Sequence, residues 1–116
     1  MASIPFEIYD NRGHKVSGLV YLEEAFVVFE VQVKKWGLYN EPSEKVKAEL
    51  GVITAIRFEP GIFGDRIYVV PKRMELLEAI PGDHKGELKL KIAKRHRDEA
   101  QRFVAEVLLK KRSAQG

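Results

Sequence analysis

The chain has 116 residues, a formal net charge of +3 and charged side chains at 32% of its positions. This length predicts one domain over residues 1–116, whose core at about residues 4–110 needs neither disulfides nor metals for stability. The absence of cysteine excludes a disulfide framework and a thiolate zinc site.

Residues 1–10 carry acids where a secretory signal peptide has basic residues and an apolar run. The longest unbroken apolar stretches, such as residues 25–29, are far shorter than the roughly 20 residues that a membrane-spanning helix needs. We therefore expect a cytoplasmic protein with no transmembrane segment.

Alternation of apolar and polar residues predicts strands at residues 4–9, 16–22 and 25–34. In the third strand every second residue from Val27 to Val33 is apolar. The opposite face begins with Phe26 and Val28 and then becomes polar, which is typical of a curved sheet or a barrel. Phe26 and Val28 are either covered by a loop or available as a contact surface.

The next segment, WGLYNEPS, is predicted to be a loop because of its Gly, Asn and Pro residues. It carries Trp36, Leu38 and Tyr39. With Phe26 and Val28 these side chains are predicted to form a protein interface, because aromatic residues are enriched at interfaces. The alternative is that they fold back over one end of the barrel.

Further strands are predicted at residues 45–50, 53–58, 66–71 and 88–92. The alternation slips by one residue near Gly51, which predicts a bulge or a corner where the chain passes from one sheet to the next. Segment 74–80 is ambiguous, and a short helix or loop is favoured over a short strand. Residues 59–65 and 81–86 are predicted to be turns. Phe63 is predicted to pack against the protein, with a contact role as the alternative.

Residues 94–112 have helical periodicity. Their apolar side chains recur at i, i+3, i+4, i+7 and i+8, at Ala100, Phe103, Val104, Val107 and Leu108. This stripe predicts a C-terminal helix that plugs one end of the barrel. Asp98 is a better N-cap than His96, so the helix starts at Asp98 or is capped in another way. Residues 113–116 are predicted to be a disordered tail.

The later part of the chain reads GVITAIRFEPGIFGDRIYV and, further on, GELKLKIAKRHRDEAQRFVAEVL. Its motifs are an I-x-x-I-x-F strand, a loop that ends in an aromatic residue and a glycine, an I-P-G turn, and L-x-L-x-I-A-x-R running into R-D-E-A. They resemble the bacterial pleckstrin-homology-like (PH-like) domains, over roughly residues 4–110. The resemblance implies a mainly β fold, a partly open barrel of two roughly orthogonal antiparallel sheets capped by one C-terminal α-helix. The chain departs from the pattern at His96, where relatives tend to carry an acid.

Eukaryotic relatives of this fold often bind phosphoinositides through clustered bases on the first hairpin. Here that hairpin supplies only Arg12, His14 and Lys15, so we expect no specific phosphoinositide binding.

Residues 94–112 hold seven of the 20 bases and three of the 17 acids, so the positive surplus of the chain lies in the predicted helix. The bases near its two ends are candidates for contact with an anionic ligand or membrane: Lys94, Arg95, Arg97, Lys110, Lys111 and Arg112. A solvated helix face is the favoured interpretation. Acids spread along the chain argue against a nucleic-acid-binding protein.

The sequence contains no recognisable catalytic or metal-binding motif. His14, His84 and His96 lack an HxxxH or HExxH companion, and no serine has a nucleophile-elbow context. We therefore predict no enzymatic activity, no metal and no cofactor. The predicted function is a binding module that acts by protein–protein interaction and self-association through a β-barrel surface. The alternative is weak binding of an anionic ligand or membrane surface through the basic C-terminal helix.

Overall fold

The computed structural model describes residues 3–9, 15–32, 44–80 and 85–115. Its elements are β1 (Ile4–Tyr9), β2 (Lys15–Glu23), β3 (Phe26–Gln32), β4 (Glu44–Glu49), the 3-10 turn η1 (Leu50–Val52), β5 (Ile53–Glu59), β6 (Asp65–Pro71), α1 (Met74–Ala79), β7 (Leu88–Ile92), the 3-10 turn η2 (Lys94–His96) and α2 (Arg97–Gln115). The protein is therefore mainly β, with one long helix at the C-terminal end, as the sequence predicts.

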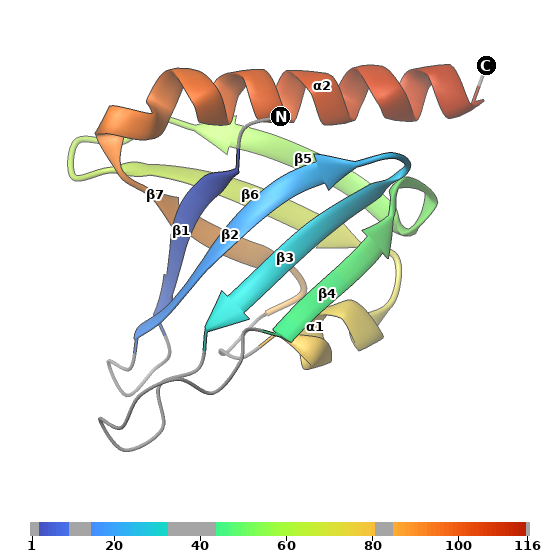
Figure 1. The fold of residues 1–116 in the computed structure, drawn as a ribbon, viewed down its shortest axis with the longest axis horizontal. Helices are drawn as coiled ribbons and strands as arrows, with labels where there is room; N and C mark the ends of the chain where they lie inside the picture. The colour runs from blue at the N-terminus through green and yellow to red at the C-terminus, as the bar shows by residue number, and fades with distance from the viewer. Residues whose placement is uncertain (1–2, 10–14, 33–43, 81–84, 116) are drawn as a thin grey trace.

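The seven strands form one antiparallel sheet in the order β4-β3-β2-β1-β7-β6-β5. Consecutive strands pair from β1 to β4 and again from β5 to β7, and β1 pairs with β7 to join the first four strands to the last three. The sheet curves, and α2 lies across one end of it alongside β5 (Figure 1). Within the described residues the two edge strands, β4 and β5, do not pair with each other, so the sheet is not closed. The short helix α1 contacts both β4 and β6.

The core lies inside this curved sheet. In β1 and β7 alternate residues are buried, as the periodicity of the sequence predicts, and β7 supplies Leu88, Leu90 and Ile92. In β3 the consecutive residues Val27, Val28 and Phe29 are all buried. Each such side chain contributes about 1.5–3 kcal/mol when it is fully removed from water. Burial of these inward-facing side chains is therefore a large favourable contribution to folding.

The slip in alternation near Gly51 predicts a bulge or a corner between two sheets, and the structure has an irregularity there within one sheet. The chain makes the 3-10 turn η1 there, and the pairing of β5 with β6 shifts its register between Ile53 and Ala55. The backbone N–H of Leu50 donates to the carbonyl of Ala25 at 3.0 Å, which ties η1 to the β2–β3 turn. Segment 74–80 adopts the helical alternative, as α1.

The helix α2 begins at Arg97, after the 3-10 turn η2, rather than at Asp98. Asp98 instead lies in the first turn with Glu99, where a negative charge interacts favourably with the helix dipole. The helix continues to Gln115 and so includes residues 113–115 of the predicted tail. Within the described residues, no helix is both long enough and apolar enough to cross a membrane.

The stripe of α2 is buried at Ala100, Phe103, Val104 and Val107, as predicted, but Leu108 is exposed. The first three turns of α2 therefore pack against one end of the curved sheet.

Candidate functional site

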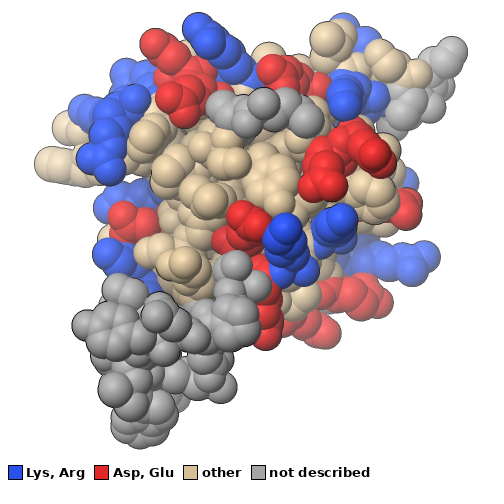
Figure 2. All heavy atoms as spheres, viewed as in Figure 1, with Lys and Arg blue, Asp and Glu red and all other residues tan. Residues whose placement is uncertain are grey.

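Two large apolar side chains stand at the tip of the loop between β5 and β6. Ile62 is 80% exposed and Phe63 is 91% exposed. The prediction that Phe63 packs against the protein is therefore wrong, and the alternative of a contact role remains. Figure 2 shows uncharged atoms projecting at the end of the molecule that carries this loop, with Lys and Arg atoms beside them. We call residues Ile62 and Phe63 the apolar tip.

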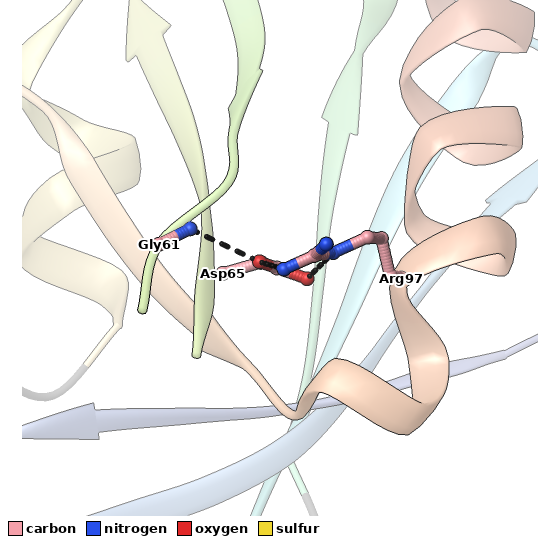
Figure 3. Close-up of polar contacts among 3 residues, drawn as sticks. All are labelled: Gly61, Asp65 and Arg97. Carbon is pink, nitrogen blue, oxygen red and sulfur yellow. Dashed lines mark hydrogen bonds and ion pairs between the residues drawn. The ribbon is translucent and has the colours of Figure 1, made fainter. Parts of the chain in front are cut away.

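A buried ion pair holds the base of this loop. Asp65, the first residue of β6, is fully buried and receives two hydrogen bonds from Arg97 at the start of α2, from Nε at 2.9 Å and from Nη2 at 2.8 Å. The backbone N–H of Gly61 donates a third hydrogen bond to Asp65, at 3.1 Å. Figure 3 shows the Asp65 carboxylate between the loop and the first turn of α2. The loop is thus fastened to the helix that caps the fold.

The charge of Asp65 is stabilised where it lies. The hydrogen bonds from Arg97 hold the pKa of the Asp65 carboxyl below its ordinary value of 3.8; burial opposes this shift, and the Gly61 N–H and the charges of Arg97 and Lys94 reinforce it. Asp65 is therefore ionised at neutral pH, and its three hydrogen bonds are all charge-assisted.

The two glycines of the loop make its tight turn possible. A Cβ on Gly61 would lie 2.4 Å from the carbonyl oxygen of Gly64, and Gly64 has a φ of +128°, which L-residues rarely adopt. The apolar tip is therefore presented on a turn that only glycine fits at these two positions.

Charged side chains of both signs surround the apolar tip. Two hollows beside it have volumes of about 210 and 300 Å³, and their linings include the bases Arg66, Lys91 and Lys94 and the acids Glu7 and Glu59. The tip thus has an apolar centre and a mixed, slightly basic surround. This is the arrangement of a contact surface, in which an apolar anchor lies inside a polar rim.

Of the six bases predicted to contact anions, three bond to β6, to the β2–β3 turn or to β5. Arg97 pairs with Asp65. Lys110 Nζ donates to the carbonyl of Glu24 at 2.9 Å, and Lys111 Nζ donates to the carbonyl of Ile53. Burial, followed by the nearby charge of Lys72, lowers the pKa of the Lys111 ammonium. These three bases hold α2 to the sheet.

The other three, Lys94, Arg95 and Arg112, are exposed. Lys94 and Arg95 precede the first turn of α2, whereas Arg112 lies near the end of this 19-residue helix. At 1.5 Å per residue the two ends are over 20 Å apart. The structure therefore does not bring the basic clusters together into one surface.

The predicted protein interface lies only partly within the described residues, because Trp36, Leu38 and Tyr39 fall outside them. Phe26 is half-buried, with Lys47 Nζ 6.0 Å from its ring centroid. Val28 is fully buried, so its side chain is covered rather than available to a partner. On the face seen in Figure 2, uncharged atoms extend over β1 to β3.

A further apolar hollow is formed where residues of β4 and α1 meet. Its volume is about 330 Å³, and it is lined by residues of β4, η1, the end of β6, the N-cap of α1 and α1 itself: Val46, Lys47, Ala48, Val52, Pro71, Arg73, Glu75, Leu76 and Ala79. We call it the edge hollow. Sequence reasoning missed it, because its walls come from segments that are up to 33 residues apart.

Sequence reasoning also missed the pairing of Asp65 with Arg97. One signal was present: Asp65 precedes Ile67 and Val69 at spacing two, which puts a carboxylate on the inward face of β6. A buried carboxylate needs a partner.

Comparison of the chain with protein-family models, with curated proteins and with solved structures gives no match.

Proposed function

We propose that this chain is a non-enzymatic binding module that acts by protein–protein contact and associates with further copies of itself. The observation that carries the proposal is the apolar tip, Ile62 and Phe63, exposed on a loop that Asp65 and Arg97 fasten to α2. As part of the same proposal the protein acts in the cytoplasm.

The geometry of the tip favours binding because the anchor is already in position. Ordering a loop and its side chains when two proteins associate costs free energy, and a loop that is fastened beforehand loses less conformational freedom. Large side chains that fill a pocket on the partner commonly carry most of the binding energy of an interface. Phe63, at 91% exposure, is the side chain that would gain most from such a pocket.

Sedimentation velocity over a concentration series tests this proposal. We expect wild-type protein to form oligomers whose fraction rises with concentration, and the variant Ile62→Gln/Phe63→Gln to stay monomeric. The matched control is Leu108→Gln/Leu109→Gln, which removes two exposed apolar side chains from α2 and leaves the tip unchanged. A wild-type protein that stays monomeric throughout would contradict self-association.

The finer description of the fold belongs to the same proposal. We infer a PH-like arrangement in which β1–β4 and β5–β7 form two roughly orthogonal layers. It is supported by the strand order. Strands β4 to β1 and strands β7 to β5 are each consecutive in the chain, and the order jumps only where β1 meets β7. The helix that follows β7 also supports it. An experimental structure tests it, since a measured angle far from perpendicular between the two layers would exclude this arrangement.

A second candidate function is contact with an anionic membrane surface. The observation that favours it is that Lys91 and Lys94 line the same hollow as Ile62 and Phe63. An apolar tip with bases beside it can insert between lipid headgroups while the bases face the anionic surface. Co-sedimentation with vesicles of phosphatidylcholine, with and without phosphatidylserine, tests it. Binding that needs phosphatidylserine and falls steeply with salt would support it, and equal recovery in the supernatant with both vesicles would exclude it.

A further inference from the structure

The apolar tip and the edge hollow lie at opposite ends of one hairpin. In the pairing of β5 with β6, Glu59 opposite Arg66 is next to the loop, and Ile53 opposite Pro71 is at the open end. Pro71 lines the edge hollow. Strands of seven residues are about 20 Å long at roughly 3.3 Å per residue. One copy therefore cannot fill its own edge hollow with its own tip.

The edge hollow is suited to an apolar side chain. Its volume of about 330 Å³ lies at the lower end of the range of about 300–1,000 Å³ for pockets that hold small ligands. Val46 and Val52 line it from the sheet side and Leu76 lines it from α1. All three are only partly buried, and they pack against the core with the rest of their surface. Filling the hollow would remove the remaining apolar surface from water.

We propose that the apolar tip of one copy of this chain inserts into the edge hollow of a second copy. The inference rests on the proposed self-association and specifies its geometry. Tip and hollow are different surfaces, so the contact is heterologous and each copy keeps one free tip and one free hollow. Association of this kind runs head to tail, and it produces open chains of copies unless the rotation between neighbours closes a ring.

The charges around the two surfaces are compatible with this contact. The rim of the edge hollow contains Arg73 and Glu75, and the surround of the tip contains Lys91 and Glu59. Each rim therefore offers a base and an acid to the other. Lys47, also on the rim, lies 4.0 Å from Glu23 of its own chain. Only two side chains enter the hollow, so we expect association that is weak and depends on concentration.

The test uses one variant that blocks the hollow and one that lacks the tip. Ala79 is exposed and lines the edge hollow, so Ala79→Trp fills it without replacing a core residue. Ala105→Trp is the matched control, since Ala105 is exposed on α2 and lines neither the edge hollow nor the two hollows beside the tip. Circular dichroism and thermal melting verify that each variant is folded. The tip is removed by Ile62→Gln/Phe63→Gln.

Sedimentation velocity then gives outcomes that differ for the two geometries. Head-to-tail insertion predicts that Ala79→Trp and the tip variant are each monomeric alone, and that mixing them restores a dimer with one copy of each and no larger species. Ala105→Trp should behave as wild type. If Ala79→Trp still self-associates while the tip variant does not, the tip binds a different surface. The insertion is then overturned and the proposed function stands. If wild-type protein is monomeric, both the insertion and the proposed self-association are overturned.

Discussion

Arg97, the first residue of α2, holds both carboxylate oxygens of Asp65, the first residue of β6, although the two residues are 32 positions apart. The pair is asymmetric, because Asp65 is fully buried whereas the Arg97 side chain is 39% exposed. One ion pair thus joins the capping helix, the sheet and, through the Gly61 N–H, the loop that presents the apolar tip. Stability and presentation of the tip are coupled at Asp65.

This asymmetry predicts that removing Arg97 destabilises the protein more than removing Asp65. Asp65→Asn leaves a partly exposed guanidinium that water can solvate, and we expect it to lower the free energy of unfolding by about 1.5–3 kcal/mol. Arg97→Met leaves a buried carboxylate without its counter-ion, and the larger loss is expected there. Urea denaturation measures both. Arg102→Met, an exposed base five residues further along α2, is the control and should change little. Equal losses for the two variants would contradict the buried charge of Asp65.

The ion pair between Asp65 and Arg97 also predicts how the free energy of unfolding depends on pH. Folding lowers the pKa of the Asp65 carboxyl. The stability that this carboxylate contributes is therefore complete above the unfolded pKa, near 3.8, and is lost as the pH falls through the folded pKa. The difference in unfolding free energy between wild type and Asp65→Asn should therefore be constant at neutral pH and shrink below pH 3.8. Denaturation at a series of pH values measures it. A difference that stays constant into strong acid would show that the Asp65 charge is not stabilising.

Gly18 of β2 is predicted to tolerate no side chain. It pairs with Phe6 of β1, and a Cβ there would lie 2.3 Å from the Glu30 carbonyl oxygen and 2.7 Å from Phe6 Cζ. Because the backbone oxygen cannot move without breaking the sheet, Gly18→Ala should lower the free energy of unfolding by about 3 kcal/mol. The matched control is Gly51→Ala, where a Cβ meets nothing within 4 Å. That variant should be neutral or slightly stabilising, and thermal melting compares the two.

Lys110 and Lys111, near the end of α2, are predicted to stabilise the fold. Lys111 Nζ donates to the Ile53 carbonyl from a partly buried position, so Lys111→Met removes a charged hydrogen bond and should lower the free energy of unfolding by about 1.5 kcal/mol. Lys110→Met loses an exposed hydrogen bond to the Glu24 carbonyl and should lose less. Arg112→Met is the control, since Arg112 is exposed. Equal melting temperatures for all three variants would mean that neither lysine anchors the helix.

Much of the fold could be read from local patterns. The alternation in LKLKI and the stripe from Ala100 to Val107 predict their elements correctly, because a side chain's direction within a strand or helix depends only on its position along that element. The irregularity at Gly51 was visible for the same reason, as a slip in the period.

The candidate site was less predictable. Phe63 and Phe29 have the same side chain, yet one is almost fully exposed and the other is fully buried. Nothing in the residue type distinguishes them, since burial depends on which distant segment covers each ring. Similarly, Arg97 and Arg112 are both bases of α2. Arg97 forms an ion pair within the protein because Asp65 lies beside it, whereas Arg112 is exposed.

Hydrophobic periodicity is a property of neighbouring residues, so the strands and the long helix could be located without a structure. The pairing of Asp65 with Arg97, the hydrogen bonds of Lys110 and Lys111 to backbone carbonyls, and the exposure of Ile62 and Phe63 are visible only in the folded chain. Partners and exposure are set by contacts between segments far apart in the chain. Such contacts depend on how the strands pair and where the helix lies.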